Sequence, residues 1–222
     1  MDERLKEVNN WVFDLDDTLY PPNPTLYNQM AKKICQYIQE ILHVDEETAK
    51  IMREAYYMKY GATVCGLVVE HHINPYDFTK RIHDLDFSSL SPSPKLREYL
   101  LKLNGRRFVL TNGDHNYAIK ILQKIQLDDL FDGVFAIQQM GFITKPSPLT
   151  YRKMMRMYDI DPRYAAMFDD NQNNVLGAKN SGMYAVWVAS NDFHKTNEIL
   201  DNQNFYDAQT PDVLTFLKNM FD

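Results

Sequence analysis

Cysteine, long apolar runs and excess positive charge are all scarce in this sequence. Its 222 residues include two cysteines, Cys35 and Cys65, which lie in segments with helical patterning. A disulfide between them stays open, but we favour two buried free thiols in a reducing compartment. No apolar run approaches the roughly 20 residues that a membrane helix needs. The N-terminal segment MDERLKEVNN has acidic residues and no apolar stretch, so we expect no secretory signal.

The charge balance and the composition narrow the class of protein further. The net charge is −6, which disfavours a nucleic acid polymer as a partner because a phosphate backbone attracts basic surfaces. We therefore expect a soluble, cytoplasmic protein that binds neither nucleic acid nor membrane, as a monomer or a homodimer. The hydrophobic share of 45% is ordinary for a folded chain. Its length suits one large domain, or a core with a smaller insertion.

Five short apolar runs are typical of buried strands in a parallel sheet. They lie at 11–13, 108–110, 134–137, 165–168 and 184–188. Helical patterns separate the later runs, and their starts are marked by Ser93-Pro94, Ser147-Pro148 and Thr210-Pro211, while Asn104-Gly105 closes the first of them. This alternation predicts an α/β fold, a Rossmann-like parallel sheet with helices on both faces.

The stretch from 21 to 92 has a different pattern. Asp45 and Asn74-Pro75 fit the starts of two helices, and no convincing strand is present. A longer amphipathic helix is indicated by apolar residues at helical spacing, namely Leu26, Met30, Ile34, Ile38 and Ile41. We therefore predict an all-helical cap domain of residues 21–92, inserted into a catalytic core formed by residues 1–20 and 93–222.

Polar residues follow three of the apolar runs at the point where each run ends. These segments are Asp14-Leu15-Asp16-Asp17-Thr18, Thr111-Asn112-Gly113 and Asp169-Asp170. Ligands of open α/β sheets bind outside the carboxyl ends of the strands, so we expect the three segments to border one cleft. A fourth segment, Lys145-Pro146, lies where a helix between two strands begins.

These residue types suit phosphoryl transfer. Of two carboxylates spaced like Asp14 and Asp16, one can attack phosphorus, while the other protonates the leaving oxygen and then activates water. Facing carboxylates repel, and hard oxygen ligands without a His or Cys cluster favour Mg²⁺. Further ligands would come from Asp169 and Asp170. Phosphate oxygens would be held by Thr111, by backbone N–H groups near Asn112, and by the charge of Lys145.

Each segment alone has a simpler explanation. Asp-Asp is frequently a helix cap, Thr-Asn-Gly is frequently a turn, and a lysine before proline is usually a solvated helix start. None of these explanations predicts all four segments in this order, three of them at strand ends. The joint pattern therefore favours the catalytic interpretation.

The four segments resemble the signature motifs of the haloacid dehalogenase-like hydrolase superfamily. The matching strings are Phe13-Asp14-Leu15-Asp16-Asp17-Thr18-Leu19, Thr111-Asn112-Gly113, Lys145-Pro146, and Phe168-Asp169-Asp170 with Asn174. The resemblance implies that Asp14 is the nucleophile and Asp16 the general acid/base. It also implies that Thr111 and Lys145 bind phosphate, that Asp169 binds Mg²⁺ together with the backbone carbonyl of Asp16, and that residues 21–92 are a cap of the first type.

A narrower resemblance is to the pyrimidine 5′-nucleotidase branch. It rests on Tyr20-Pro21, Tyr60-Gly61-Ala62-Thr63, Gly66-Leu67 and His83-Asp84. The resemblance implies a pyrimidine nucleoside 5′-monophosphate as substrate, with Tyr20, Tyr60 and Thr63 near it. Asn171 stands where such relatives commonly have Ser, which leaves the positioning of Asp170 open.

Four alternatives remain. One is a phosphatase for another small metabolite, such as a sugar phosphate or pyridoxal phosphate. Another is a haloacid dehalogenase, although dehalogenation has no use for the acid Asp16 or for a cation at Asp169. A third is a phospho-accepting signalling domain, which is much shorter, and a fourth is a catalytically silent binding protein, which the intact set of four segments disfavours. We therefore predict a Mg²⁺-dependent phosphomonoester hydrolase that acts through an aspartyl phosphate on Asp14.

Overall fold

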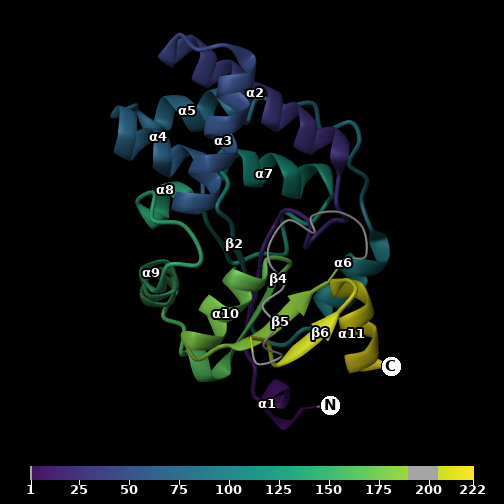
Figure 1. Ribbon diagram of the computed structural model, residues 1–222. Coiled ribbons are helices and arrows are strands. Elements are labelled where there is room, and N and C mark those ends of the chain that lie inside the picture. Colours follow the sequence, from purple (N-terminus) through teal and green to yellow (C-terminus); the bar gives the residue numbers. More distant parts are fainter. Residues whose placement is uncertain (1, 190–204) are drawn as a thin grey trace.

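The computed structural model describes residues 2–189 and 205–222 (Figure 1). In these ranges six strands form one parallel sheet, in the order β3-β2-β1-β4-β5-β6. The strands are β1 (Asn10–Phe13), β2 (Arg106–Leu110), β3 (Gly133–Phe135), β4 (Ala165–Asp169), β5 (Tyr184–Val188) and β6 (Ala208–Thr210). The predicted α/β class with a parallel sheet is confirmed.

Helices cover both faces of the sheet (Figure 1). One face packs against α6 (Pro94–Leu101), α7 (His115–Lys124) and α11 (Val213–Phe221), the other against α8 (Ile137–Met140), α9 (Pro148–Tyr158) and α10 (Gln172–Asn180). Successive side chains of a strand point to opposite faces. Accordingly, Trp11 and Phe13 of β1 join the first apolar cluster and Val12 joins the second. The core also contains two short elements, α1 (Glu3–Lys6) and a 3₁₀ turn at Pro162–Tyr164.

The helical cap lies beyond the carboxyl ends of the strands (Figure 1). It consists of α2 (Pro24–Leu42), α3 (Glu46–Tyr60), α4 (Thr63–His71) and α5 (Pro75–Ile82), and residues 21–92 contain no strand. The cap has its own apolar cluster, in which Ile38, Leu67 and Phe78 are buried, and Ile137 of α8 joins this cluster from the core. The domain limits at residues 20 and 93 stay a prediction, and residues 190–204 of the predicted core lie outside the described ranges.

Most predicted helix starts are confirmed by side-chain caps. Asp45, Asn74, Ser93 and Ser147 each accept a hydrogen bond from a backbone N–H of the first turn. The start predicted at Thr210-Pro211 was wrong. Thr210 ends β6, where its carbonyl accepts a hydrogen bond from the Ala189 N–H at 2.8 Å, and Asp212 caps α11 instead.

Two other predicted limits also need correction. The apolar run at 134–137 was predicted to extend to Ile137, but β3 ends at Phe135 and Ile137 opens α8. The helix that begins at Pro94 ends at Leu101, before the predicted stop at Asn104-Gly105. Cys35 and Cys65 are free thiols, as predicted, although Cys65 is only half-buried. Among the described helices, none is both long and apolar enough to cross a bilayer.

Candidate active site

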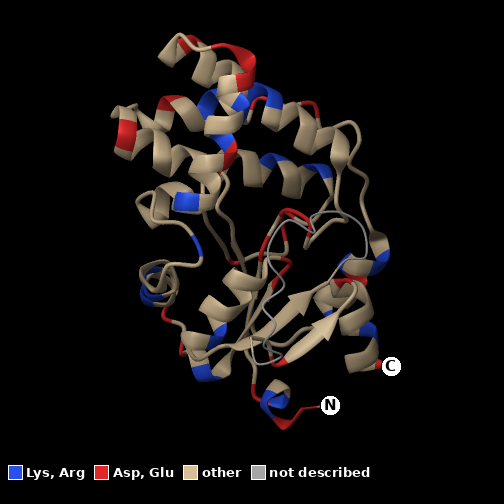
Figure 2. Ribbon diagram, in the orientation of Figure 1, with Lys and Arg blue, Asp and Glu red and all other residues tan. Residues whose placement is uncertain are grey.

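The sheet register brings the first and last predicted segments together. Phe13 of β1 pairs with Val109 of β2 on one side and with Phe168 of β4 on the other. Asp14 and Asp169, which follow Phe13 and Phe168, therefore lie side by side, and the Asp14 N–H donates to the Phe168 carbonyl at 2.8 Å. The strand order reverses between β1 and β4, which is where open α/β sheets bind ligands. Acidic segments of the ribbon meet at this end of the sheet in Figure 2.

A buried lysine joins the two carboxylates. The Lys145 Nζ lies 2.9 Å from Asp14 Oδ1 and 2.7 Å from Asp169 Oδ2, and it donates to the Leu110 carbonyl at 2.9 Å. Lys145 is 1% exposed and Asp169 is fully buried. Burial pulls the pKa of Lys145 down, but the charges of Asp14 and Asp169 outweigh it, so the net shift is upward. Lys145 is therefore a fixed positive charge.

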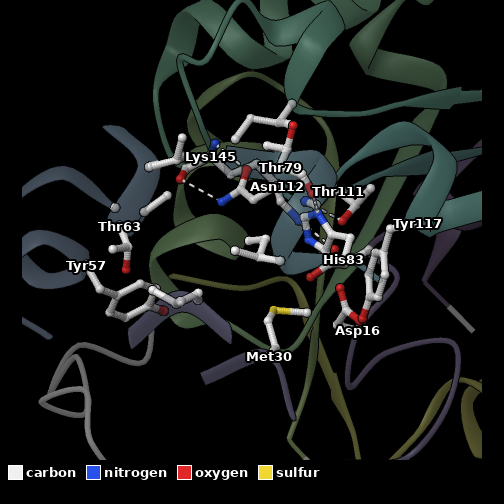
Figure 3. Close-up of a pocket in the computed structure, with 18 of the residues that line it drawn as sticks. Asp16, Met30, Tyr57, Thr63, Thr79, His83, Thr111, Asn112, Tyr117 and Lys145 are labelled. Atoms are coloured by element: carbon white, nitrogen blue, oxygen red, sulfur yellow. Dashed lines mark hydrogen bonds and ion pairs between the residues drawn. The ribbon is translucent and has the colours of Figure 1, made fainter. Parts of the chain in front are cut away.

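The side chain of Asn112 fixes the backbone of Lys145. Its Oδ1 accepts from the Lys145 N–H at 2.9 Å, and its Nδ2 donates to the Lys145 carbonyl at 3.2 Å, the dashed contact in Figure 3. Because the amide is engaged in this way, a phosphate contact of Asn112 would come from its backbone N–H. The neighbouring Thr111 is buried, and its hydroxyl accepts from the Gly113 N–H at 2.9 Å.

The segment after β4 holds Asp169 in one orientation. Asp169 Oδ1 accepts from the Asn171 N–H at 2.9 Å and from Asn174 Nδ2 at 3.0 Å. Asn171 also caps α10, where its Oδ1 accepts from the N–H groups of Asn173 and Asn174. The asparagine that departs from the usual serine thus serves as the helix cap, which places Asn174 beside Asp169.

Three carboxylates lie together at this point, and the single positive charge of Lys145 does not balance them. Oxygen atoms of Asp14, Asp169 and Asp170 lie within 4.8 Å of one another. Burial raises the pKa of Asp14 to about 8, with Asp169 adding to the rise and Lys145 opposing it. Burial, followed by the charges of Asp169 and Asp14, raises the pKa of Asp170 well above its usual range. When all three are ionised, Lys145 leaves two negative charges uncompensated. An all-oxygen donor set with this deficit fits Mg²⁺.

Asp16 lies at the edge of this cluster and has two tyrosine partners. Its Oδ1 accepts a hydrogen bond from the Tyr117 hydroxyl at 2.6 Å and another from the Tyr20 hydroxyl. Figure 3 shows Tyr117 beside Asp16, with His83 of the cap next to it. Asp16 is half-buried, whereas Tyr20 and Tyr117 are buried.

A cavity of about 290 Å³ lies between these core residues and the cap. Asp14, Asp16, Thr111 and Lys145 line its core side. Its cap side is mainly apolar, with a few polar groups (Figure 3), and is formed by Met30, Ile34, Tyr57, Thr63, Val64, Phe78, Thr79, Ile82 and His83. The predicted catalytic residues Asp14, Asp16 and Lys145 therefore line a single cavity.

A family model of haloacid dehalogenase-like hydrolases matches residues 10–182, a span that contains all four segments of the site. This chain belongs to the haloacid dehalogenase-like hydrolase family. Among curated relatives, phosphate metabolism protein 8 of Saccharomyces cerevisiae is 27% identical over 220 residues, covering 91% of this chain and 68% of that protein. The glyceraldehyde 3-phosphate phosphatase of Pyrococcus abyssi is 28% identical over 195 residues, covering 79% of each chain.

Solved structures of this family share the fold. A haloacid dehalogenase-type phosphatase from Thermococcus onnurineus superposes with a TM-score of 0.63 and 19% identity, over 96% of this chain and 97% of that one. An L-2-haloacid dehalogenase from Xanthobacter autotrophicus gives a TM-score of 0.59 and 18% identity, over 96% and 98%. Because the same fold supports different reactions, the chemistry of this hydrolase has to be argued from its site.

The three residues predicted near the substrate by the narrower resemblance, Thr63, Tyr20 and Tyr60, make different contacts in the structure. Thr63 lines the cavity, and its hydroxyl donates to the Arg53 carbonyl at 3.1 Å. Tyr20 reaches Asp16 from the segment that leads into the cap. Tyr60 donates to the Glu70 carboxylate on α4, and Tyr57, one turn earlier, lines the cavity of this hydrolase instead.

Sequence reasoning missed two residues of the site, Tyr57 and Tyr117. Tyr57 is one of three tyrosines near the end of α3, with Tyr56 and Tyr60. The sequence does not show which of the three rings faces the cavity, because the packing of the helix decides it. Tyr117 lies in the first turn of α7, directly after the Thr111-Asn112-Gly113 segment. Its position next to that segment was the one available signal, because its partner Asp16 is 101 residues away.

Proposed function

We propose that this hydrolase is a Mg²⁺-dependent phosphomonoesterase that forms an aspartyl phosphate on Asp14. The observation that supports it best is the buried lysine bridge between Asp14 and Asp169, with Asp170 as a third carboxylate. The bridge supplies one fixed positive charge beside the nucleophile, where a phosphoryl group would be attacked. Preorganised charge of this kind usually contributes most to such catalysis.

The residues of the chain divide the work as follows. Asp14 would attack phosphorus, and the positive charge of Lys145 would offset the negative charge of the phosphate. The Thr111 hydroxyl and the backbone N–H of Asn112 would donate to the phosphate oxygens. Asp16 would protonate the leaving oxygen and then accept a proton from the attacking water. The Asp14, Asp169 and Asp170 carboxylates and the Asp16 carbonyl would hold Mg²⁺, which supplies charge compensation for the carboxylates and the phosphate.

The acid and the cation site distinguish this reaction from dehalogenation. A halide leaves without a proton, so a carboxyl group held at the position of Asp16 would have no task. A dehalogenase also has no use for three carboxylates that need a cation, such as Asp14, Asp169 and Asp170. Both features support the phosphatase.

The apolar lining on the cap side of the cavity favours a substrate whose leaving group is uncharged and has a flat apolar part. Met30, Ile34, Val64 and Phe78 offer apolar contacts, and Lys145 is the one Lys or Arg side chain among the described residues that line the cavity. A single buried cation suits one phosphate group. We therefore favour nucleoside 5′-monophosphates. The preference for pyrimidines rests on the resemblance of the cap strings and on the modest cavity volume.

A small sugar phosphate is the second candidate substrate. The name of the archaeal relative, a glyceraldehyde 3-phosphate phosphatase, favours it. Sugars are usually bound by many polar side chains, whereas the polar cap groups at this cavity are few, Tyr57, Thr63, Thr79 and His83.

Phosphate release from a substrate panel tests the proposal. With Mg²⁺, kcat/KM should be higher for UMP and CMP than for AMP, GMP or glyceraldehyde 3-phosphate. EDTA should abolish turnover, and Asp14→Asn should be folded but inactive. Full activity in EDTA would contradict the metal requirement. A higher kcat/KM for glyceraldehyde 3-phosphate would replace the nucleotide assignment, and halide release from 2-chloropropionate without phosphate release would overturn the phosphatase itself.

A further inference from the structure

Asp16 is held by two hydroxyl groups that reach the same carboxylate oxygen. The Tyr20 and Tyr117 hydroxyls both donate to Oδ1. They come from different parts of the chain, Tyr20 from the segment between β1 and the cap and Tyr117 from the first turn of α7. A carboxylate oxygen offers two lone pairs, so these two donors occupy Oδ1 fully.

Both tyrosines are fixed donors. Tyr117 is 1% exposed and Tyr20 is 7% exposed. Burial, followed by the negative charge of Asp16, raises the pKa of each hydroxyl well above its ordinary value. Both therefore keep their protons at neutral pH and stay hydrogen-bond donors to Asp16.

The ring of Tyr117 is itself held by the cap. The His83 ring packs on it with centroids 4.6 Å apart, and Phe87 lies 5.9 Å away. His83 is fixed in turn, because its Nδ1 donates to the Thr79 carbonyl at 2.8 Å. The orientation of Asp16 thus depends on contacts from both the core and the cap.

We propose that Tyr20 and Tyr117 are positioning residues that hold Asp16 by Oδ1 and leave Oδ2 as the oxygen that exchanges the proton with the substrate. This inference rests on the proposed phosphatase function. In the first step an Asp14 oxygen bonds to phosphorus, the phosphorus–oxygen bond to the leaving group breaks, and the leaving oxygen takes the proton from Oδ2. In the second step water bonds to phosphorus, its proton passes to Oδ2, and the bond to Asp14 breaks.

The dependence of the rate on the leaving group separates positioning from a general structural role. A poor leaving group, such as an alkoxide, needs the proton of Asp16, whereas p-nitrophenolate leaves with little protonation. The experiment measures kcat/KM, which reports the first step, for phosphate esters whose alcohols range from p-nitrophenol through phenol to alkyl alcohols. The slope of log kcat/KM against the pKa of the alcohol is compared between variants.

Tyr20→Phe and Tyr117→Phe remove only the hydroxyl groups and keep the buried rings. Each should lower kcat/KM for an alkyl phosphate by about tenfold, the order expected for one hydrogen bond to a charged group, and leave p-nitrophenyl phosphate within about twofold. The slope should steepen in each variant, more in the double variant, and most in Asp16→Asn.

The chain offers a matched control for this experiment. Tyr99 of α6 donates to the Asp222 carboxylate at 2.6 Å, the distance at which Tyr117 donates to Asp16. Tyr99→Phe should leave the slope unchanged. Equal losses on all esters in Tyr20→Phe and Tyr117→Phe, with the wild-type slope, would overturn the positioning role while leaving the phosphatase in place. A wild-type protein that hydrolyses none of these esters would overturn the proposed function and this inference together.

Discussion

At the scale of single residues, the site depends on Lys145. Its ammonium group contacts two carboxylates and one carbonyl while being almost fully buried. A buried charge is stable only when it is paired and hydrogen-bonded, and the Asn112 side chain fixes the backbone that presents it. The sequence predicted Lys145 as a positive charge near phosphate, but its contacts with Asp14, Leu110 and Asp169 could be found only from the fold.

His83 should make the protein less stable at mildly acidic pH. Burial lowers the pKa of its ring, against the opposing effects of Asp114 and the Thr79 carbonyl. The unfolded chain therefore binds a proton more readily than the folded one. The stability that this neutral ring contributes is fully present above the unfolded pKa, near 6.5, and is lost as the pH falls towards the lower folded value.

Urea unfolding at pH 7.5 and 5.5 checks this expectation. The wild-type protein should lose more unfolding free energy between these two pH values than His83→Gln, which cannot titrate. His72→Asn is the control, because His72 is exposed and asparagine tolerates its positive φ of 54°; it should keep the wild-type dependence. The same loss in wild type and His83→Gln would contradict the account.

The site residues that could be predicted from the sequence belong to short motifs that follow apolar runs. Asp14, Thr111 and Asp169 each follow an apolar run, so strand periodicity places them at one end of the sheet. The roles of Asn112 and Tyr117 were not predictable in this way, because their partners are 33 and 101 residues away. Contacts at such separations depend on the packing of whole elements.

At the scale of elements, five strands followed from apolar runs and one did not. β6 reads Ala208-Gln209-Thr210 and has no apolar character of its own. It forms because Val186, Trp187 and Val188 of β5 present an edge that pairs with it. The start of α11 was predicted wrongly for the same reason, because the pairing of β6 with β5 keeps Thr210 in the sheet.

Gly105, in the turn before β2, should be intolerant of a side chain. Its φ is +80°, and an added Cβ would lie 2.1 Å from the Asn9 carbonyl oxygen. Gly182 is a matched control, with φ +92° but with its nearest neighbours, in Pro162, at 3.4 Å. Gly182→Ala should cost about 1 kcal/mol from backbone strain alone.

The contact with the Asn9 backbone should make Gly105→Ala worse than Gly182→Ala by at least about 1 kcal/mol, because a backbone atom cannot move aside as a flexible side chain does. Chemical denaturation of the two variants and the wild type measures this difference. Equal costs for the two substitutions would show that the turn relaxes freely and that the close approach is unimportant.

At the scale of the whole molecule, the cavity forms between two layers. The cap lies over the carboxyl ends of the strands (Figure 1). The core supplies charged groups at these strand ends, and the cap side of the cavity is mainly apolar. The existence of both layers followed from the change of periodicity between residues 21 and 92. Which cap side chains face the core did not follow, because the orientation of α3 towards the cavity is set by its packing against α2 and α4.

In the proposed mechanism Asp14 becomes phosphorylated and Asp16 assists both steps. The reaction of Asp16→Asn with p-nitrophenyl phosphate decides whether this holds. The first step should proceed, since nitrophenolate needs little protonation, but water attack should lack its base. A covalent phosphate should therefore accumulate.

Mass spectrometry of the digested protein then locates this phosphate. The proposed mechanism predicts an increment of one phosphoryl group on the peptide that contains Asp14, and this increment should be absent in Asp14→Asn combined with Asp16→Asn. A phosphoryl group on Asp17, Thr18 or any other residue, or no covalent phosphate on a folded protein that binds Mg²⁺, would contradict it.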